Sequence, residues 1–244
     1  MANSDIEKSR PVKLAAKPEL ITNVLRTAAS QRREDPDYFK VFSVGFNKTA
    51  TTSIYSLFKS LGFEAMDGPH WRNNCQWHLH FQFQTFTDGP PEDFRYLDRS
   101  FPNSKFLLNI RRLDEWLDSR IEHVKFRLQT PGYKSRMSRG RLPDKDIVMS
   151  WAIKREIHHS DVLEYFASRP SDLLILNYID DPEAPQKLAE FVGKKWDRED
   201  RPYTRSTPST REKGVLKNSD LIYSALREIG IAEDKFSSDL LYSV

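Results

Sequence analysis

The chain has 244 residues, with 38 Lys and Arg against 35 Asp and Glu, which gives a formal net charge of +3. This length suits one α/β domain with a sizeable core, and a charge so near balance does not call for a nucleic-acid partner. The only cysteine, Cys75, excludes an internal disulfide and a cysteine metal cluster.

Targeting signals are absent from the sequence as it stands. It has no apolar run of membrane-spanning length, and its first residues lack the apolar core of a signal peptide. We therefore expect a cytoplasmic protein that does not bind membranes. The polar start and the helical periodicity that follows predict an N-terminal arm and helix over residues 1–36. Residues 37–244 are expected to form the α/β domain.

Residues 40–62 predict a strand, a loop and a helix in close succession. Val41 to Val44 is a short apolar run typical of a buried strand. From Thr51 apolar residues recur at helical spacing, and Gly62 stands where helices commonly end. The free N–H groups of a helix N-terminus, its dipole and the ammonium of Lys48 would together attract an anion. The candidate ligands are Gly45, Phe46, Asn47, Lys48, Thr49, Ala50, Thr51, Thr52 and Ser53.

The alternative is an ordinary turn whose hydroxyl groups cap the helix, but a cap needs only one Ser or Thr. A nucleoside-triphosphate loop has the form GxxxxGK[ST]. Gly45 and Thr52 fit that form, whereas Ala50 and Thr51 stand in place of its second glycine and its lysine. The stretch G-x-N-K-T-x-T-T-S instead resembles the 5′-phosphosulfate loop of sulfotransferases that use PAPS (3′-phosphoadenosine 5′-phosphosulfate).

A second stretch has the same order of elements. Residues 105–110 predict a buried strand, Arg111 and Arg112 end it, and a helix follows from Leu113. The phrase FPNSKFLLNIRRLDEWLDS closely resembles a segment of a bacterial-type soluble sulfotransferase family of the P-loop class. In that family an arginine at the strand end and a serine eight residues later hold the 3′-phosphate, which implies Arg111 and Ser119 here. The other reading of Arg111 is a salt bridge with Asp114 or Glu115.

The remaining pattern alternates strands and helices, with strands near 63–66 and 173–178. Helices are expected at 91–101, 147–167, 185–193 and 219–229. The aromatic-rich residues 70–87 are expected to form a helix that lines an acceptor pocket. The predicted fold class is α/β, with a P-loop-like central parallel β-sheet flanked by helices in a single domain. Ligands in such folds bind at the carboxyl ends of strands, where both phosphate motifs begin.

The resemblance covers roughly Val41 to Trp196 and implies metal-independent, in-line transfer of a sulfuryl group from PAPS, which leaves PAP. The acceptor would be a hydroxyl or amine of a small molecule, and Lys48 would stabilise the charge that develops. Asp88 is the first choice for the general base, with His70 and His80 next; Asp88 can equally be a turn-forming residue. We expect no metal site, because His78 and His80 lack the spacing of zinc ligands.

Three features depart from the family or leave its assignment open. Arg211 and Lys213 resemble an Arg-Lys-Gly element that closes over the 3′-phosphate, but Glu212 interrupts it and Arg205 is a rival. Ala50 replaces a glycine and would be strained at positive φ. Ser53 stands where cytosolic relatives stack a tryptophan on adenine, so the base would be held by another aromatic residue or by Arg112.

Other readings remain. The basic stretch between Gln129 and Asp144 is either a solvated loop or a lid. The chain could be a P-loop kinase of a small metabolite, or a nucleotide-binding module without turnover. It could be a monomer or a homodimer.

Overall fold

The computed structural model describes residues 39–72, 79–88, 94–130, 141–198, 202 and 215–241. The arm and helix predicted for residues 1–36 lie outside these ranges. Within them, no helix is both long and apolar enough to cross a bilayer.

Five parallel strands form the central sheet. They are β1 (Val41–Ser43), β2 (Ala65–Asp67), β3 (Thr85–Thr87), β4 (Lys105–Asn109) and β5 (Leu173–Leu176), in the order β2-β3-β1-β4-β5. Val41 is paired with Thr85 on one side and with Lys105 on the other, so β1 lies between β3 and β4. The predicted α/β class with a parallel sheet and flanking helices is confirmed.

The helices include α2 (Thr51–Ser60), α3 (Leu79–Gln82), α4 (Phe94–Ser100), α5 (Leu113–Leu128), α6 (Lys145–Phe166), α7 (Ala184–Phe191) and α8 (Ser219–Glu228). Short 3₁₀ turns lie at η1 (Pro69–Arg72), η3 (Pro170–Asp172) and η4 (Glu233–Lys235). These boundaries lie within a few residues of the predicted helices 91–101, 147–167, 185–193 and 219–229.

The prediction of one helix over residues 70–87 is wrong. The segment begins with η1, contains the single-turn helix α3, and ends in β3, which lies inside the sheet between β2 and β1. All three residues of β3 are buried, and the Phe86 ring stacks on that of Phe42 at 5.0 Å. A three-residue strand is too short to show a period of two, so the aromatic density of the segment was misread as a pocket-lining helix.

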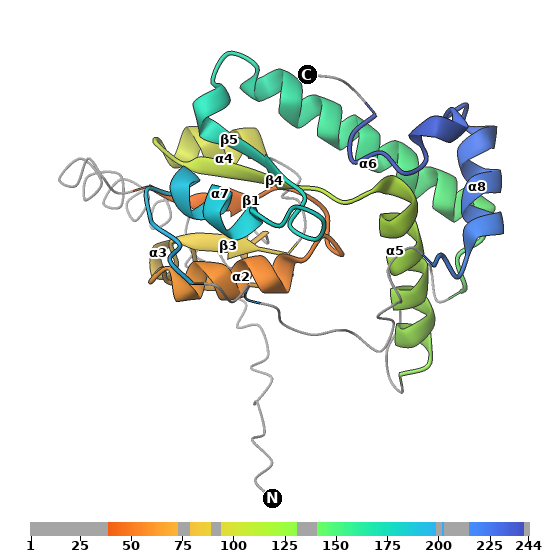
Figure 1. The fold of residues 1–244 in the computed structure, drawn as a ribbon, viewed down its shortest axis with the longest axis horizontal. Coiled ribbons are helices and arrows are strands. Elements are labelled where there is room, and N and C mark those ends of the chain that lie inside the picture. Colours follow the sequence, from red (N-terminus) through yellow and green to blue (C-terminus); the bar gives the residue numbers. More distant parts are fainter. Residues whose placement is uncertain are drawn as a thin grey trace, which may run out of the picture.

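Two layers of helices cover the sheet (Figure 1). Val41, Leu107 and Leu176 pack against α2 and α7 in one buried cluster. Phe42 and Phe106 point the opposite way, toward α4 and the C-terminal half of α6. This alternation follows from the two-residue period of a strand, because neighbouring side chains leave opposite faces of the sheet.

A third cluster lies beyond the carboxyl end of the sheet, where α5, the first half of α6 and α8 pack together (Figure 1). Its centre contains Trp116 and Leu117 of α5 with Ala152 of α6 and Leu226 of α8. Phe46, from the loop after β1, also packs into this cluster. The β1–α2 loop is therefore fixed between the sheet and the helical cluster.

The strand order determines where a ligand crevice lies. From β1 the chain passes through α2 to β2 on one side of the sheet, and from β4 it passes to β5 on the other side. Adjacent strands whose connections leave in opposite directions open a crevice at their carboxyl ends. In this sheet the crevice lies between the ends of β1 and β4.

Candidate anion-binding site

The β1–α2 loop has an unusual backbone. Lys48 and Ala50 lie at φ 72° and 66°, and Ala50 is the residue that precedes α2. Because the Ala50 side chain has no polar atom, no side-chain hydrogen bond caps the helix. The Ser53 N–H donates to the Ala50 carbonyl at 2.9 Å instead, and the positive end of the α2 dipole faces the loop. The positive φ of Ala50 is the strained case named in the sequence analysis.

Asn109, the last residue of β4, holds the start of this loop. Its Oδ1 accepts a hydrogen bond from the Gly45 N–H at 3.0 Å, and its Nδ2 donates to the Phe46 carbonyl at 3.3 Å and to the Thr49 hydroxyl. The contact leaves no room for a side chain on Gly45, because a Cβ there would lie 2.0 Å from the Asn109 carbonyl oxygen. Asn109 is fully buried, and we did not identify it from the sequence.

Arg111 joins the two strand ends. Its guanidinium donates to the Lys48 carbonyl at 3.3 Å and, through Nε and a terminal nitrogen, to Glu115 Oε2 at 3.2 Å. Arg112 also donates to Glu115, through the other carboxylate oxygen. Arg111 therefore makes the salt bridge to Glu115 that the sequence left open, and it also contacts the loop.

Glu115 carries a negative charge between these two arginines. Burial opposes ionisation of its carboxyl, but the hydrogen bond from Arg112 and the charge of Arg111 outweigh burial and lower its pKa. An anion that enters the crevice would compete with Glu115 for the donors of Arg111.

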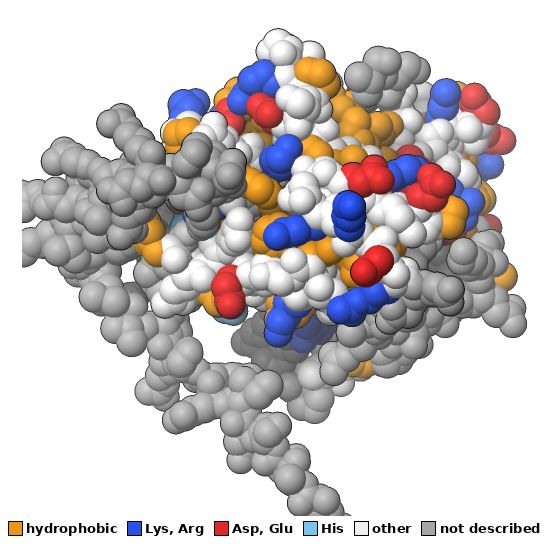
Figure 2. Space-filling view, turned by 60° about the vertical axis from the view of Figure 1, so that its left-hand side comes forward, with side chains coloured by type: hydrophobic (Ala, Val, Ile, Leu, Met, Phe, Trp, Pro, Cys, Tyr) orange, Lys and Arg blue, Asp and Glu red, His pale blue; other side chains and the backbone are white. Residues whose placement is uncertain are grey.

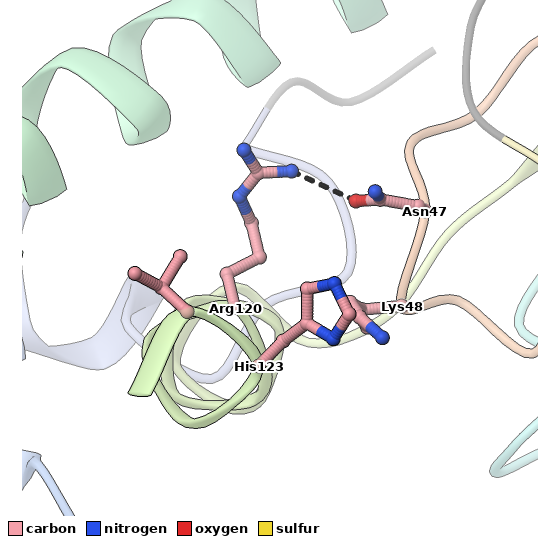
Figure 3. A pocket seen from close by; sticks show the side chains of 5 residues that line it. Asn47, Lys48, Arg120 and His123 are labelled. Atoms are coloured by element: carbon pink, nitrogen blue, oxygen red, sulfur yellow. Dashed lines mark hydrogen bonds between the residues drawn. The ribbon is translucent and has the colours of Figure 1, made fainter. Parts of the chain in front are cut away.

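Helix α5 provides further contacts to the loop. The Trp116 indole N–H donates to the Asn47 carbonyl at 2.9 Å, and Arg120 donates to Asn47 Oδ1 at 2.8 Å (Figure 3). The Arg120 guanidinium lies over the Trp116 ring at 4.9 Å and over the Trp151 ring at 4.6 Å. These contacts hold a buried cation against the loop, and they fix the conformation of Asn47.

A small pocket lies between the loop and α5, with a volume of about 10 Å³, close to that of one water-sized group. It is lined by Asn47, Lys48, Arg120, His123 and Val124. Burial lowers the pKa of Lys48 below its usual 10.5; the charge of Asp88 opposes this shift. Three neighbouring positive charges add to it, those of Arg127, Arg120 and Arg111.

His123 lies on α5 and lines the same pocket as Lys48 (Figure 3). Burial and the positive charges of Lys48, Arg127 and Arg120 lower its pKa to about 4, so its imidazole is neutral at pH 7. Burial also lowers the pKa of Arg120, to about 9, which leaves that guanidinium charged. The pocket is thus strongly cationic.

The other predicted loop residues differ in exposure. Phe46 packs into the helical cluster, and the Thr49 hydroxyl is turned inward, where it donates to the Phe46 carbonyl. Thr51 and Ser53 are buried in the first turn of α2, whereas Thr52 is exposed. Ser119 is half-buried on α5, one turn before His123. Arg211 and Lys213, with their rival Arg205, lie outside the described residues.

The three candidate bases lie in different surroundings. Asp88 directly follows β3, at φ 88°, and its charge acts on Lys48. His70 is exposed in η1, after β2, which β3 separates from β1. The ring of His80 packs 5.2 Å from both Phe86 and Phe101. The structure therefore brings Asp88 to the loop and places His80 in the aromatic core.

The α5 residues missed from the sequence share a helical spacing. Trp116, Arg120, His123 and Arg127 follow one another at intervals of four, three and four residues, which places them on one face. This periodicity was visible in the sequence, but only the pairing of β1 with β4 shows that the face points at the loop. Outside the pocket, Lys and Arg side chains are interspersed with Asp and Glu over the face shown in Figure 2.

A wider groove of about 710 Å³ runs along α6. Ile153 and Ile157, both exposed, lie on its apolar side. His158 lines it as well and makes a 2.6 Å hydrogen bond with the Val44 carbonyl at the end of β1. The groove is therefore adjacent to the base of the β1–α2 loop.

No protein-family model matches the chain, and no curated protein sequence matches it either. Conclusions about function therefore rest on the geometry of the site.

Proposed function

We propose that this protein is a PAPS-dependent sulfotransferase, an enzyme that moves the sulfuryl group of PAPS to a hydroxyl or amine of a small acceptor without a metal ion. The observation that carries the proposal is the contact between Arg111 and the Lys48 carbonyl. It joins two anion-binding motifs across the β1–β4 crevice, close enough for one nucleotide to reach both. The proposal includes a P-loop type of sheet in a single domain.

The donor groups at the crevice fit a polyanionic nucleotide. Lys48, Arg120 and Arg127 bring positive charge to one side of the loop, and Arg111 does so at the end of β4. The N-terminus of α2 adds the positive end of a helix dipole. In this assignment the loop residues 45–53 hold the 5′-phosphosulfate, and Arg111 with Ser119 holds the 3′-phosphate.

When bound, PAPS supplies an activated sulfuryl group. The task of Lys48 is to stabilise negative charge on the oxygens of the sulfuryl and phosphate groups, which is most effective in a partly buried site. Asp88, whose charge acts on Lys48, is proposed to accept the proton that the acceptor hydroxyl or amine gives up. Asn109 and Arg120 keep the loop in shape through the hydrogen bonds to Gly45 and Asn47.

A kinase of the P-loop class is the second candidate, because it would use the same crevice for a nucleotide. Such an enzyme holds magnesium with an acidic residue near the phosphates. The strands β4 and β5 lead into Arg111 and Asn177, and the acidic residue brought to the loop is Asp88, to which the sulfotransferase proposal gives the acceptor's proton instead of magnesium. A nucleotide-binding module without turnover would share the binding residues and differ only in activity.

Thermal unfolding with added nucleotides separates these candidates. We expect PAP to raise the midpoint temperature of unfolding in the absence of magnesium, because a ligand that binds only the folded state stabilises that state. Stabilisation by ATP with magnesium, with no effect of PAP, would favour the kinase.

Transfer is tested with labelled PAPS against a panel of hydroxyl and amine acceptors, apolar ones first because of the groove along α6. Lys48→Ala should lower the transfer rate by about 10²-fold or more and largely keep PAP binding. Lys59→Ala, an exposed change in the last turn of α2, is the matched control and should transfer normally. PAP binding without transfer to any acceptor would favour the binding module, and full activity of Lys48→Ala would remove Lys48 from the mechanism.

A further inference from the structure

His123 has no role in the mechanism outlined above, yet it lines the same pocket as Lys48 and Arg120 (Figure 3). It lies one helical turn beyond Ser119, on the face of α5 that meets the loop. The pocket has room for one oxygen-sized group. A phosphate or sulfuryl oxygen there would lie among the side chains of Lys48, Arg120 and His123.

The charges that act on His123 come from two elements of the described structure, the β1–α2 loop and α5. Lys48 of the loop and Arg120 and Arg127 of its own helix all act on it, and all are positive. Asp88, which acts on Lys48 from the end of β3, has the opposite sign. A bound dianion would offset much of this positive potential, because two negative charges would then face the imidazole and favour its protonated form.

We propose that His123 is a ligand of the anion that enters this pocket, and that its imidazole takes up one proton from solvent as the anion binds. The neutral ring becomes an imidazolium with two N–H donors, and no other bond is made or broken. The inference rests on the proposed function for the identity of the anion, a phosphate or sulfuryl group of PAPS. The proton uptake itself requires only that some polyanion binds in the pocket.

Proton uptake on binding makes the affinity for the anion depend on pH in a definite direction. In the free protein His123 is neutral above about pH 4, so binding between that pH and the higher pKa of the complex consumes a proton. Affinity therefore falls as the pH rises through this range, by up to about tenfold per pH unit. Above the pKa of the complex the imidazole stays neutral, and this contribution is lost.

Isothermal titration of the full-length chain with PAP tests the proposal. Titrations near pH 7 in two buffers of different ionisation enthalpy give the number of protons taken up. The phosphates of PAP also titrate near this pH. The quantity of interest is therefore the difference in the number of protons taken up between the wild type and a His123 variant. The ligand contributes equally to both.

Two variants and one control are used. His123→Gln should bind PAP several-fold more weakly at pH 7 and take up fewer protons than the wild type. His123→Arg keeps a charge that does not titrate in this range, so it should retain affinity as the pH rises and also lose the extra uptake. His158→Gln, a histidine of α6 bonded to the Val44 carbonyl and not a lining residue of this pocket, should keep the wild-type uptake.

Each outcome of these titrations either supports or overturns the proposal. Uptake that disappears in both His123 variants supports the proposal, and uptake equal to that of the wild type in either folded variant overturns it. If PAP gives no binding heat, the sulfotransferase proposal fails, and inorganic pyrophosphate is titrated in its place. A His123-dependent uptake of protons with pyrophosphate would still support the role of His123, whereas its absence, or a lack of binding, would overturn it.

Discussion

Asn109 and Gly45 are packed so tightly that a Cβ on Gly45 would lie 2.0 Å from the Asn109 backbone carbonyl oxygen and 2.7 Å from the Asn109 side-chain amide. The two residues come from neighbouring strand ends, and the Gly45 N–H donates to the Asn109 amide oxygen at 3.0 Å. The conformation of the β1–α2 loop therefore depends on a contact between residues 64 positions apart. The atom that blocks the space is a backbone oxygen and not a flexible side-chain tip, so a side chain at position 45 could be accommodated only if β1 or β4 moved.

Gly45→Ala should destabilise the protein by about 3 kcal/mol or more, since overpacking against backbone forces the strands apart. Urea unfolding measures the loss. Gly62→Ala is the matched control: Gly62 lies at φ 86° with no atom near the added Cβ, so it should lose only about 1 kcal/mol from backbone strain. Equal losses in the two variants would contradict the tight contact.

Ala50→Gly should stabilise the folded chain by about 0.5–1 kcal/mol. Glycine has no Cβ, so it removes the strain at φ 66°, which costs about 1–2 kcal/mol. Part of this gain is lost, because glycine makes the unfolded chain more flexible. Ala167→Gly, at φ −54° at the end of α6, should instead be neutral or destabilising. A loss of stability in Ala50→Gly would show that Ala50 does not hold the left-handed conformation.

PAP affinity should fall at high pH as Lys48 loses its proton, but only a few-fold, because Lys48→Ala is expected to keep most of the PAP binding. Burial lowers the pKa of this ammonium below 10.5, so the fall should begin at a lower pH than for an exposed lysine. Asp88 raises the same pKa, and Asp88→Asn should move the fall to lower pH still. Titrations with PAP between about pH 7 and pH 10 test this. An unchanged pH profile of PAP affinity in Asp88→Asn would show that the charge of Asp88 does not act on Lys48.

Arg111 and Glu115 should affect anion binding in opposite directions. Arg111→Ala removes a charged donor and should weaken PAP binding by about 10- to 100-fold, given about 1.5–3 kcal/mol for such hydrogen bonds. Glu115→Gln removes the carboxylate that occupies Arg111 and Arg112 and should strengthen PAP binding several-fold.

Fluorescence or calorimetric titration measures both effects. Arg95→Ala is a suitable control, because Arg95 forms a half-exposed ion pair with Asp161 between α4 and α6. Weaker PAP binding in Glu115→Gln would mean that Glu115 orients Arg111 rather than competing with the anion.

A buried arginine supports the same strand end from the other side. Arg155 of α6 is 1% exposed, and its guanidinium donates to Glu156 at 2.6 Å, to the Arg111 carbonyl at 2.7 Å and to the Asp239 carbonyl at 2.6 Å. Arg155→Met should cost about 3–5 kcal/mol, since it leaves Glu156 buried without its partner. The double change Arg155→Met with Glu156→Leu should cost less than the single change.

The loss in Arg155→Met should also depend on pH. Burial raises the pKa of Glu156 even with Arg155 present, and removal of the arginine raises it further. A raised carboxyl pKa favours folding at low pH, and this contribution is lost as the pH rises. Denaturation at about pH 5 and about pH 8 should therefore show the smaller loss at pH 5, and the opposite order would contradict the pairing.

The sequence by itself determined the parts of this protein whose signals are local. The apolar run before Gly45, the helical spacing after Thr51 and the cations Lys48 and Arg111 at two strand ends are all visible within about 20 residues. The parallel α/β fold follows from the same alternation of strands and helices.

Only the tertiary structure decided which segments meet. The pairing of β1 with β4 brings Asn109 to Gly45 and Arg111 to Lys48, and the packing of α5 turns Arg120 and His123 toward the loop. The strand β3 was missed because three residues carry too little periodicity. These features depend on contacts between residues far apart in the chain, and local propensity contains no information about such contacts.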